Sequence, residues 1–159
     1  MQRAALVAIL LFCTRLFAHD VLVPASVLVQ GFPRVSVAPG DQEYLAVDLP
    51  KWDARAYMEW LKKNGVVKYT DKFDCDKFAD ACRVWANFQH NKKGLRGYSY
   101  CIGVLFYVKD VDGRGHAINF IITLDGRRVY FDPQACEGKK FVPAILTDAE
   151  VASIYHVHI

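Results

Sequence analysis

The sequence predicts one α+β domain in which N-terminal helices pack on an antiparallel sheet. Helical periodicity dominates residues 53–85, whereas β-branched and aromatic residues dominate 98–132. The dipeptide Asp125-Gly126 is a strong hairpin signal inside the second region. Helices followed by hairpin-linked strands are typical of the α+β class. The 159 residues, with 53% hydrophobic and 23% charged, suit one packed globular domain.

The N-terminal residues 1–18 read as a secretory signal. Arg3 provides the positive start, residues 4–13 form an apolar core, and Ala18 is a small residue before the cleavage point. The apolar stretch is too short for an ordinary transmembrane helix, which needs about 20 residues. We therefore expect a secreted or periplasmic protein, with an uncleaved signal as the one route to a membrane.

Residues 19–50 form an extended lead-in with strand-like pieces at 21–23 and 27–29, and a single domain follows over 51–159. The first helix spans Asp53 to Asn64 and ends at Asn64-Gly65. The second begins near Asp74, a suitable N-cap. Its apolar positions recur at three- and four-residue steps and predict one buried stripe: Cys75, Phe78, Ala79, Cys82 and Trp85.

The second half predicts strands joined by short connections. They span residues 98–109, 116–124 and 127–132, with short closing strands at 141–145 and 154–159 and a brief helix at 148–153.

The number of cysteines limits how many disulfide bridges the protein can form. Five cysteines become four after removal of a signal containing Cys13. In an oxidising compartment these could form two bridges, or one bridge if Cys75 is a free nucleophile. We favour a bridge between Cys101 and Cys136, because both lie close to the predicted sheet.

Cys75 opens the second helix, where backbone N–H groups and the helix dipole favour a thiolate. The same N–H groups could hold an oxyanion. Asp74 and Asp76 oppose this with negative charge, so activation would depend on a nearby imidazolium. The alternative is a small buried cysteine on an apolar helix face, which is how we interpret Cys82.

His116 starts a strand and Asp132 ends the next strand across the hairpin. Counting outward from Asp125-Gly126 places both near the same open end of the sheet. A carboxylate there can accept the histidine N–H and stabilise the imidazolium. The alternatives are a surface histidine and ordinary Asp-Pro turn chemistry. Together the three residues predict a nucleophile, base and orienting acid.

Three short motifs resemble the papain-like and transglutaminase-like superfamily. They are Asp74 to Ala79, Gly115 to Asn119 and Val129 to Gln134. The Asp-Cys-Asp and Pro-Gln elements look closer to the cysteine peptidase domain of certain fungal agglutinins and related bacterial and phage domains. The resemblance implies that Cys75 is the nucleophile, His116 the base and Asp132 the third member of a thiol hydrolase.

The resemblance also carries departures and a cofactor expectation. Papain-type enzymes place a Gln a few residues before the nucleophile, and this chain has none there, so Gln134 and Asn119 are our candidate oxyanion donors. The agglutinin-type peptidases require calcium, which would point to oxygen ligands from Asp74, Asp76 and Asp80. We expect no cofactor other than this calcium.

The expected substrate is a peptide or protein whose amide or isopeptide bond is cleaved through an acyl-enzyme. Alternatives are an inactive binding module of the same fold, a transglutaminase-type acyl transferase and an NlpC-type cell-wall peptidase. A metal protein using His19, His156 and His158 is a further alternative. The net charge of +3, carried by scattered doublets, predicts no nucleic-acid binding, and we expect a monomer.

Overall fold

The computed structural model describes residues 21–32, 35–36, 43–65, 70, 74–92 and 99–159. The predicted signal at 1–18 and His19 lie outside these residues. No helix in the described ranges is long and apolar enough to span a membrane.

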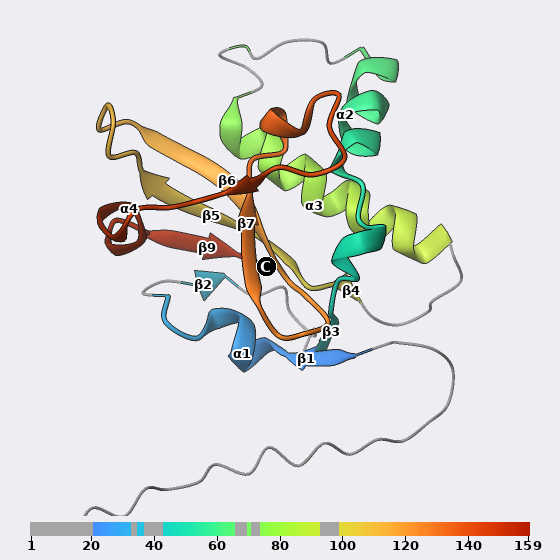
Figure 1. The fold of residues 1–159 in the computed structure, drawn as a ribbon, viewed down its shortest axis with the longest axis horizontal. Coiled ribbons are helices and arrows are strands. Elements are labelled where there is room, and N and C mark those ends of the chain that lie inside the picture. Colours follow the sequence, from blue (N-terminus) through green and yellow to red (C-terminus); the bar gives the residue numbers. More distant parts are fainter. Residues whose placement is uncertain (1–20, 33–34, 37–42, 66–69, 71–73, 93–98) are drawn as a thin grey trace, which may run out of the picture.

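The centre of the fold is a sheet with strand order β2-β9-β5-β6-β7-β8 (Figure 1). The neighbouring pairs β9–β5, β5–β6, β6–β7 and β7–β8 are antiparallel, whereas β2 pairs with β9 in parallel. This arrangement confirms the predicted α+β class. The strand bounds are β2 Val35–Ser36, β5 Ile102–Val108, β6 Gly115–Ile122, β7 Arg128–Phe131, β8 Pro143–Ala144 and β9 His156–His158.

The predicted hairpin sets the register between β6 and β7. Gly126 has φ 78°, a left-handed conformation that glycine adopts without steric cost. Its N–H donates to the Thr123 carbonyl over 2.8 Å. The strands then pair so that Asn119 faces Phe131. Asp132 therefore leaves β7 near the first residues of β6.

The helices follow the sequence prediction closely. They are α2 Ala54–Lys63, α3 Cys75–Lys92 and α4 Asp148–Ala152. The Asp53 side chain caps α2 by accepting from the Arg55 N–H, and a capping box of Thr147 and Glu150 starts α4. Short 3-10 turns, η1 Leu49–Lys51 and η2 Gln134–Cys136, lie in the connections.

The lead-in differs from the expectation at residues 27–29. The predicted strand there is wrong, because Ala25–Val29 forms the short helix α1. Pro24 fixes the extended N-cap conformation, and the helical turn buries Leu28 completely. The Arg128 guanidinium then binds the carbonyl of Leu28 over 3.0 Å and that of Gln30 over 3.1 Å.

The rest of the lead-in joins a second, small sheet. Its strands are β1 Leu22–Pro24, β3 Glu43–Leu45 and β4 Ser99–Tyr100, in the order β1-β3-β4. The predicted strand at 98–109 is thus divided at Cys101 between two sheets. Because Val23, Leu28 and Tyr44 are part of the core, the lead-in belongs to the folded domain.

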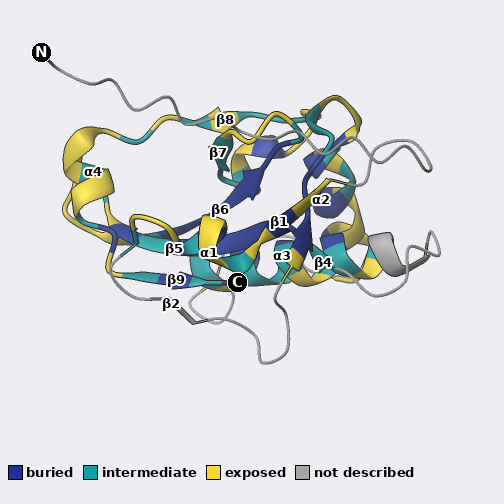
Figure 2. Ribbon diagram, turned by 90° about the horizontal axis from the view of Figure 1, so that it is seen from below, coloured by how far each residue is buried: buried dark blue, intermediate teal, exposed yellow. Residues whose placement is uncertain are grey.

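Strand β6 separates two hydrophobic clusters, because alternate side chains point to opposite faces. Ile118, Phe120 and Ile122 join the cluster that includes α1 and β1 residues. Ile121 joins the cluster formed with α2 and α3, and Ala117 packs with Ala79 of α3. Figure 2 shows the buried strands between more exposed outer elements.

The predicted Cys101–Cys136 disulfide is wrong. All four described cysteines, namely Cys75, Cys82, Cys101 and Cys136, are free thiols. Cys101 belongs to the cluster on the α1 side, whereas Cys136 belongs to the cluster on the α2 and α3 side. Because the two thiols are packed in separate clusters, they do not pair, although both lie near the central sheet.

Candidate active site

Cys75 is the first residue of α3 and is the one half-buried thiol among the described cysteines. The other three are buried, and burial raises the pKa of the Cys101 thiol to about 12 and also raises those of Cys82 and Cys136. A buried neutral thiol is a poor nucleophile, because the thiolate is the reactive form. Accessibility therefore distinguishes Cys75 from the rest.

His116 and Asp132 are in direct contact. Nε2 of His116 lies 3.1 Å from Oδ2 of Asp132. A carboxylate only accepts, so Nε2 carries the donated proton and Nδ1 is the free basic nitrogen. The His116 side chain is 11% exposed and that of Asp132 is 25% exposed, so the pair is shielded but reachable.

The turn after β7 orients the Asp132 carboxylate. Its Oδ1 accepts the backbone N–H of Gln134 over 2.9 Å, while Oδ2 faces His116. Asp132 thus combines ordinary Asp-Pro turn chemistry with the histidine contact. The two sequence interpretations of this residue describe the same geometry.

Cys75 packs where α3 meets strands β5 and β6. It packs against the cluster of Ala79, Val104 and Ala117. In the described part of the chain no hydrogen bond joins the Cys75 sulfur to His116. Catalytic hydrogen bonds are often loose without substrate and tighten when it binds.

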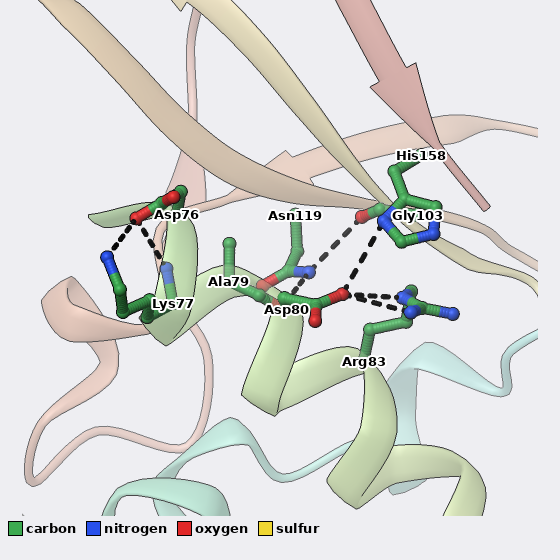
Figure 3. A network of polar contacts seen from close by, with 8 residues as sticks. All are labelled: Asp76, Lys77, Ala79, Asp80, Arg83, Gly103, Asn119 and His158. Atoms are coloured by element: carbon green, nitrogen blue, oxygen red, sulfur yellow. Dashed lines mark hydrogen bonds and ion pairs between the residues drawn. The ribbon is translucent and has the colours of Figure 1, made fainter. Parts of the chain in front are cut away.

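Asn119 holds α3 against the sheet, as Figure 3 shows. Its amide nitrogen donates to the Ala79 carbonyl over 2.9 Å and to the Gly103 carbonyl over 3.2 Å, and the residue is 0% exposed. Both amide protons are therefore used inside the protein. Asn119 fixes the helix that carries Cys75 and is not available as an oxyanion donor.

Gln134 keeps a free donor. Its side-chain Nε2 is buried and has no hydrogen-bond partner among the described residues. It lies two residues after Asp132, at the start of η2. An unpaired buried amide is costly unless a bound group uses it. Of the two predicted oxyanion candidates, Gln134 is the one that the geometry leaves available.

Asp74, just before α3, and Asp76 and Asp80 within it have cationic partners in the chain. Lys77 Nζ lies 2.7 Å from Asp74 and 3.5 Å from Asp76, and Arg83 lies 2.9 Å from Asp80 (Figure 3 shows the Asp76 and Asp80 contacts). Contacts with Asp76 and Lys77 lower the pKa of Asp74 to about 2. The predicted calcium ligands are thus ion-pair partners.

Five of the six residues named for a metal site are described, since His19 lies outside the described ranges. Within the described ranges, no group of three or more His, Cys, Asp or Glu side chains is arranged to hold a metal ion. His158 Nδ1 instead lies 3.7 Å from Asp80, and the His156 ring packs on Phe106 at 5.6 Å. The described members of the two proposed donor sets therefore do not form a three-ligand site.

Tyr107 is a site neighbour that sequence reasoning missed. It pairs with His116 across β5 and β6, and their rings lie 5.7 Å apart at 68°. No motif marked it, because only the strand register brings the two rings together.

Comparisons with known proteins show the fold. No protein-family model matches the chain, and no curated protein matches its sequence. Among solved structures, PSL1a in complex with E64 is similar, with a TM-score of 0.62 and 16% identity over 87% of this chain. A Polyporus squamosus lectin bound to the epitope Neu5Aca2-6Galb1-4GlcNAc is similar with a TM-score of 0.59 and 17% identity over 84% of this chain.

The chain has the papain-like α+β fold seen in PSL1a. It spans only about half of each similar chain, 51% of PSL1a and 46% of the lectin. At these identities the similarity concerns the fold alone. The chemistry of this chain therefore rests on its own residues.

Proposed function

We propose that this protein is a thiol hydrolase that cleaves peptide or isopeptide bonds through an acyl-enzyme on Cys75. The observation that carries the proposal is the His116–Asp132 pair, 3.1 Å apart, in a chain whose half-buried thiol, Cys75, opens α3. Nδ1 of His116 is left free to take the thiol proton. The papain-like fold and the complex of PSL1a with E64 add support.

In the proposed reaction the Cys75 sulfur attacks the amide carbonyl and forms the C–S bond. His116 has taken the thiol proton and gives it to the leaving nitrogen as the C–N bond breaks. Asp132 stabilises the imidazolium between these steps. The Cys75 backbone N–H and the Gln134 amide are the donors proposed for the oxyanion.

Water completes the cycle. His116 takes a proton from water as its oxygen attacks the thioester, and the products are a carboxylic acid and the free thiol. An amine in place of water would give acyl transfer of the transglutaminase type. No described residue marks an amine site, so hydrolysis is the proposed outcome.

The test is covalent labelling. Purified protein treated with E64, and separately with iodoacetamide, should gain one adduct that peptide mass spectrometry assigns to Cys75. Cys75→Ala should remove the adduct while keeping the fold, because the substitution is small. His116→Ala should slow labelling by about 100-fold, the usual contribution of a positioned base.

A matched control is His156→Ala, which removes another half-buried histidine that contacts an aromatic ring of β5. It should label at the parent rate. Equal labelling of the parent and His116→Ala proteins would overturn the assignment of the base. Labelling at a different cysteine would overturn that of the nucleophile.

A binding module without turnover is the second candidate, because the similar Polyporus squamosus protein is described as a lectin bound to a glycan epitope. If Cys75 were labelled no faster than the free amino acid cysteine, the result would favour this binding module.

For cellular context we propose export to the periplasm or exterior, a peptide or protein substrate, and a monomer. N-terminal sequencing of the mature protein tests the export.

A further inference from the structure

Tyr107 contacts the imidazole of His116 from the neighbouring strand. The residues are direct partners in the β5–β6 register, so their side chains share one face of the sheet. Their ring centroids lie 5.7 Å apart with an interplanar angle of 68°, an edge-to-face arrangement. Tyr107 is 5% exposed, so its own ring is held by the surrounding core.

A single hydrogen bond does not fix an imidazole ring. The contact between Nε2 and Asp132 restrains one atom, but the ring can still tilt about that contact. A tilt moves Nδ1, the nitrogen left for the thiol, on the opposite part of the ring. The edge-to-face contact with Tyr107 is the second restraint, because it opposes rotation of the ring plane.

Tyr107 also interacts electrostatically with the other two groups of the proposed site. Burial raises the pKa of the Tyr107 hydroxyl to about 12, with further contributions from the charges of Glu150, Asp132 and Cys75. The hydroxyl therefore stays neutral at physiological pH. One side chain thus contacts the ring of the base and lies within electrostatic range of both the acid and the thiol.

We infer that Tyr107 is a positioning residue of the Cys75 site, whose aromatic ring holds the His116 imidazole so that Nδ1 faces the thiol. This role rests on the proposed function. It requires the ring and does not require the hydroxyl.

The experiment compares Tyr107→Phe and Tyr107→Leu in the full chain by the rate of Cys75 labelling with iodoacetamide. Tyr107→Phe keeps the ring and should label within about twofold of the parent. Tyr107→Leu should label more slowly, by up to about 100-fold, because small misplacements of a catalytic group can cost that much.

A double-mutant cycle with His116→Ala separates positioning from a structural role. If Tyr107 acts through the imidazole, Tyr107→Leu should cause no further loss once His116 is removed. A merely structural residue would lower labelling in both backgrounds. Tyr44→Leu is the matched control, since Tyr44 is a buried tyrosine of the same cluster on β3, and it should leave the labelling rate unchanged.

The outcomes are distinct. Slow labelling by Tyr107→Phe, or an added loss in the His116→Ala background, would overturn the positioning role while leaving the proposed function intact. If the parent protein itself shows no enhanced Cys75 reactivity and His116→Ala changes nothing, the proposed function fails as well. Circular dichroism of each variant identifies any that does not fold, and Tyr107→Met then replaces Tyr107→Leu.

Discussion

The side chain of Asn119 on β6 donates to the carbonyl of Ala79 on α3, one helical turn after Cys75. The bond connects the sheet that carries His116 with the helix that carries the thiol. A second bond from the same amide to Gly103 ties it to β5. This buried amide thus helps to hold α3 in place against the sheet.

Asn119→Leu keeps the approximate size of the side chain and removes both donors. We expect a loss of about 1–3 kcal/mol in the free energy of unfolding, because two buried carbonyls lose a partner. Labelling of Cys75 should also slow as α3 shifts. Urea denaturation and the labelling assay measure the two effects.

Asn87→Leu is the control for that experiment. Asn87 accepts the Tyr100 N–H over 2.7 Å near the other end of α3. Its loss should destabilise the protein to a similar degree without slowing Cys75 labelling. A parallel effect of both substitutions on labelling would contradict a specific role for Asn119.

Asp132 should tolerate an amide better than an aliphatic group. Asp132→Asn keeps an oxygen that can accept the His116 N–H but loses the charge that stabilises imidazolium. Asp132→Ala loses the bond altogether, which is worth about 1.5–3 kcal/mol for a charged partner, or about ten- to a hundredfold in rate. We expect labelling rates in the order parent, Asp132→Asn, Asp132→Ala, and the reverse order of the two variants would contradict the orienting role.

Gly103 has no room for a side chain. An added Cβ would lie 2.3 Å from Cε1 of Phe120 and 3.1 Å from the carbonyl oxygen of His158. Gly103→Ala should therefore destabilise the protein by about 1–3 kcal/mol, the usual cost of overpacking a core. Gly115→Ala is the control, because its nearest neighbour would be Tyr155 Oη at 3.7 Å. Thermal unfolding should separate the two variants clearly.

His158 should make the fold sensitive to mild acid. Burial chiefly lowers its pKa below the ordinary 6.5, and Arg83 lowers it further, whereas Asp80 opposes the shift and His156 adds to it. The unfolded chain then binds a proton more readily than the folded one, so stability falls as the pH drops below about 6.5. The midpoint of unfolding of His158→Asn should fall less than that of the parent between pH 7.5 and pH 5. Parallel pH curves for the two proteins would exclude this contribution.

Much of the fold could be predicted from local sequence signals. Asp53 as a cap and Asp125-Gly126 as a turn mark boundaries by short-range chemistry, so the helix α2 and the β6–β7 hairpin appear at the expected residues. The contact of His116 with Asp132 followed from counting residues outward from that turn. Because the strand register is set at the turn, it predicts which residues face each other for only a few residues on either side.

The features that depend on tertiary packing were not predictable. Residues 27–29 look like a strand by composition, but they belong to the helix α1, in which Leu28 is buried. Cys101 and Cys136 both lie near the sheet, yet no local pattern assigns a residue to one cluster or the other. Asn119 looked like a free donor because its two carbonyl partners come from distant parts of the chain.

The hydrogen bonds from Arg128 to the carbonyls of Leu28 and Gln30, at the end of α1, have a practical consequence. Arg128 lies on the strand that leads to Asp132, and its guanidinium also stacks 4.3 Å from the Phe32 ring. A fragment that starts at residue 51 would lack these partners of Arg128, and the apolar side of the sheet would be exposed to solvent. Shortened versions made for expression should therefore retain everything from Leu22 onward.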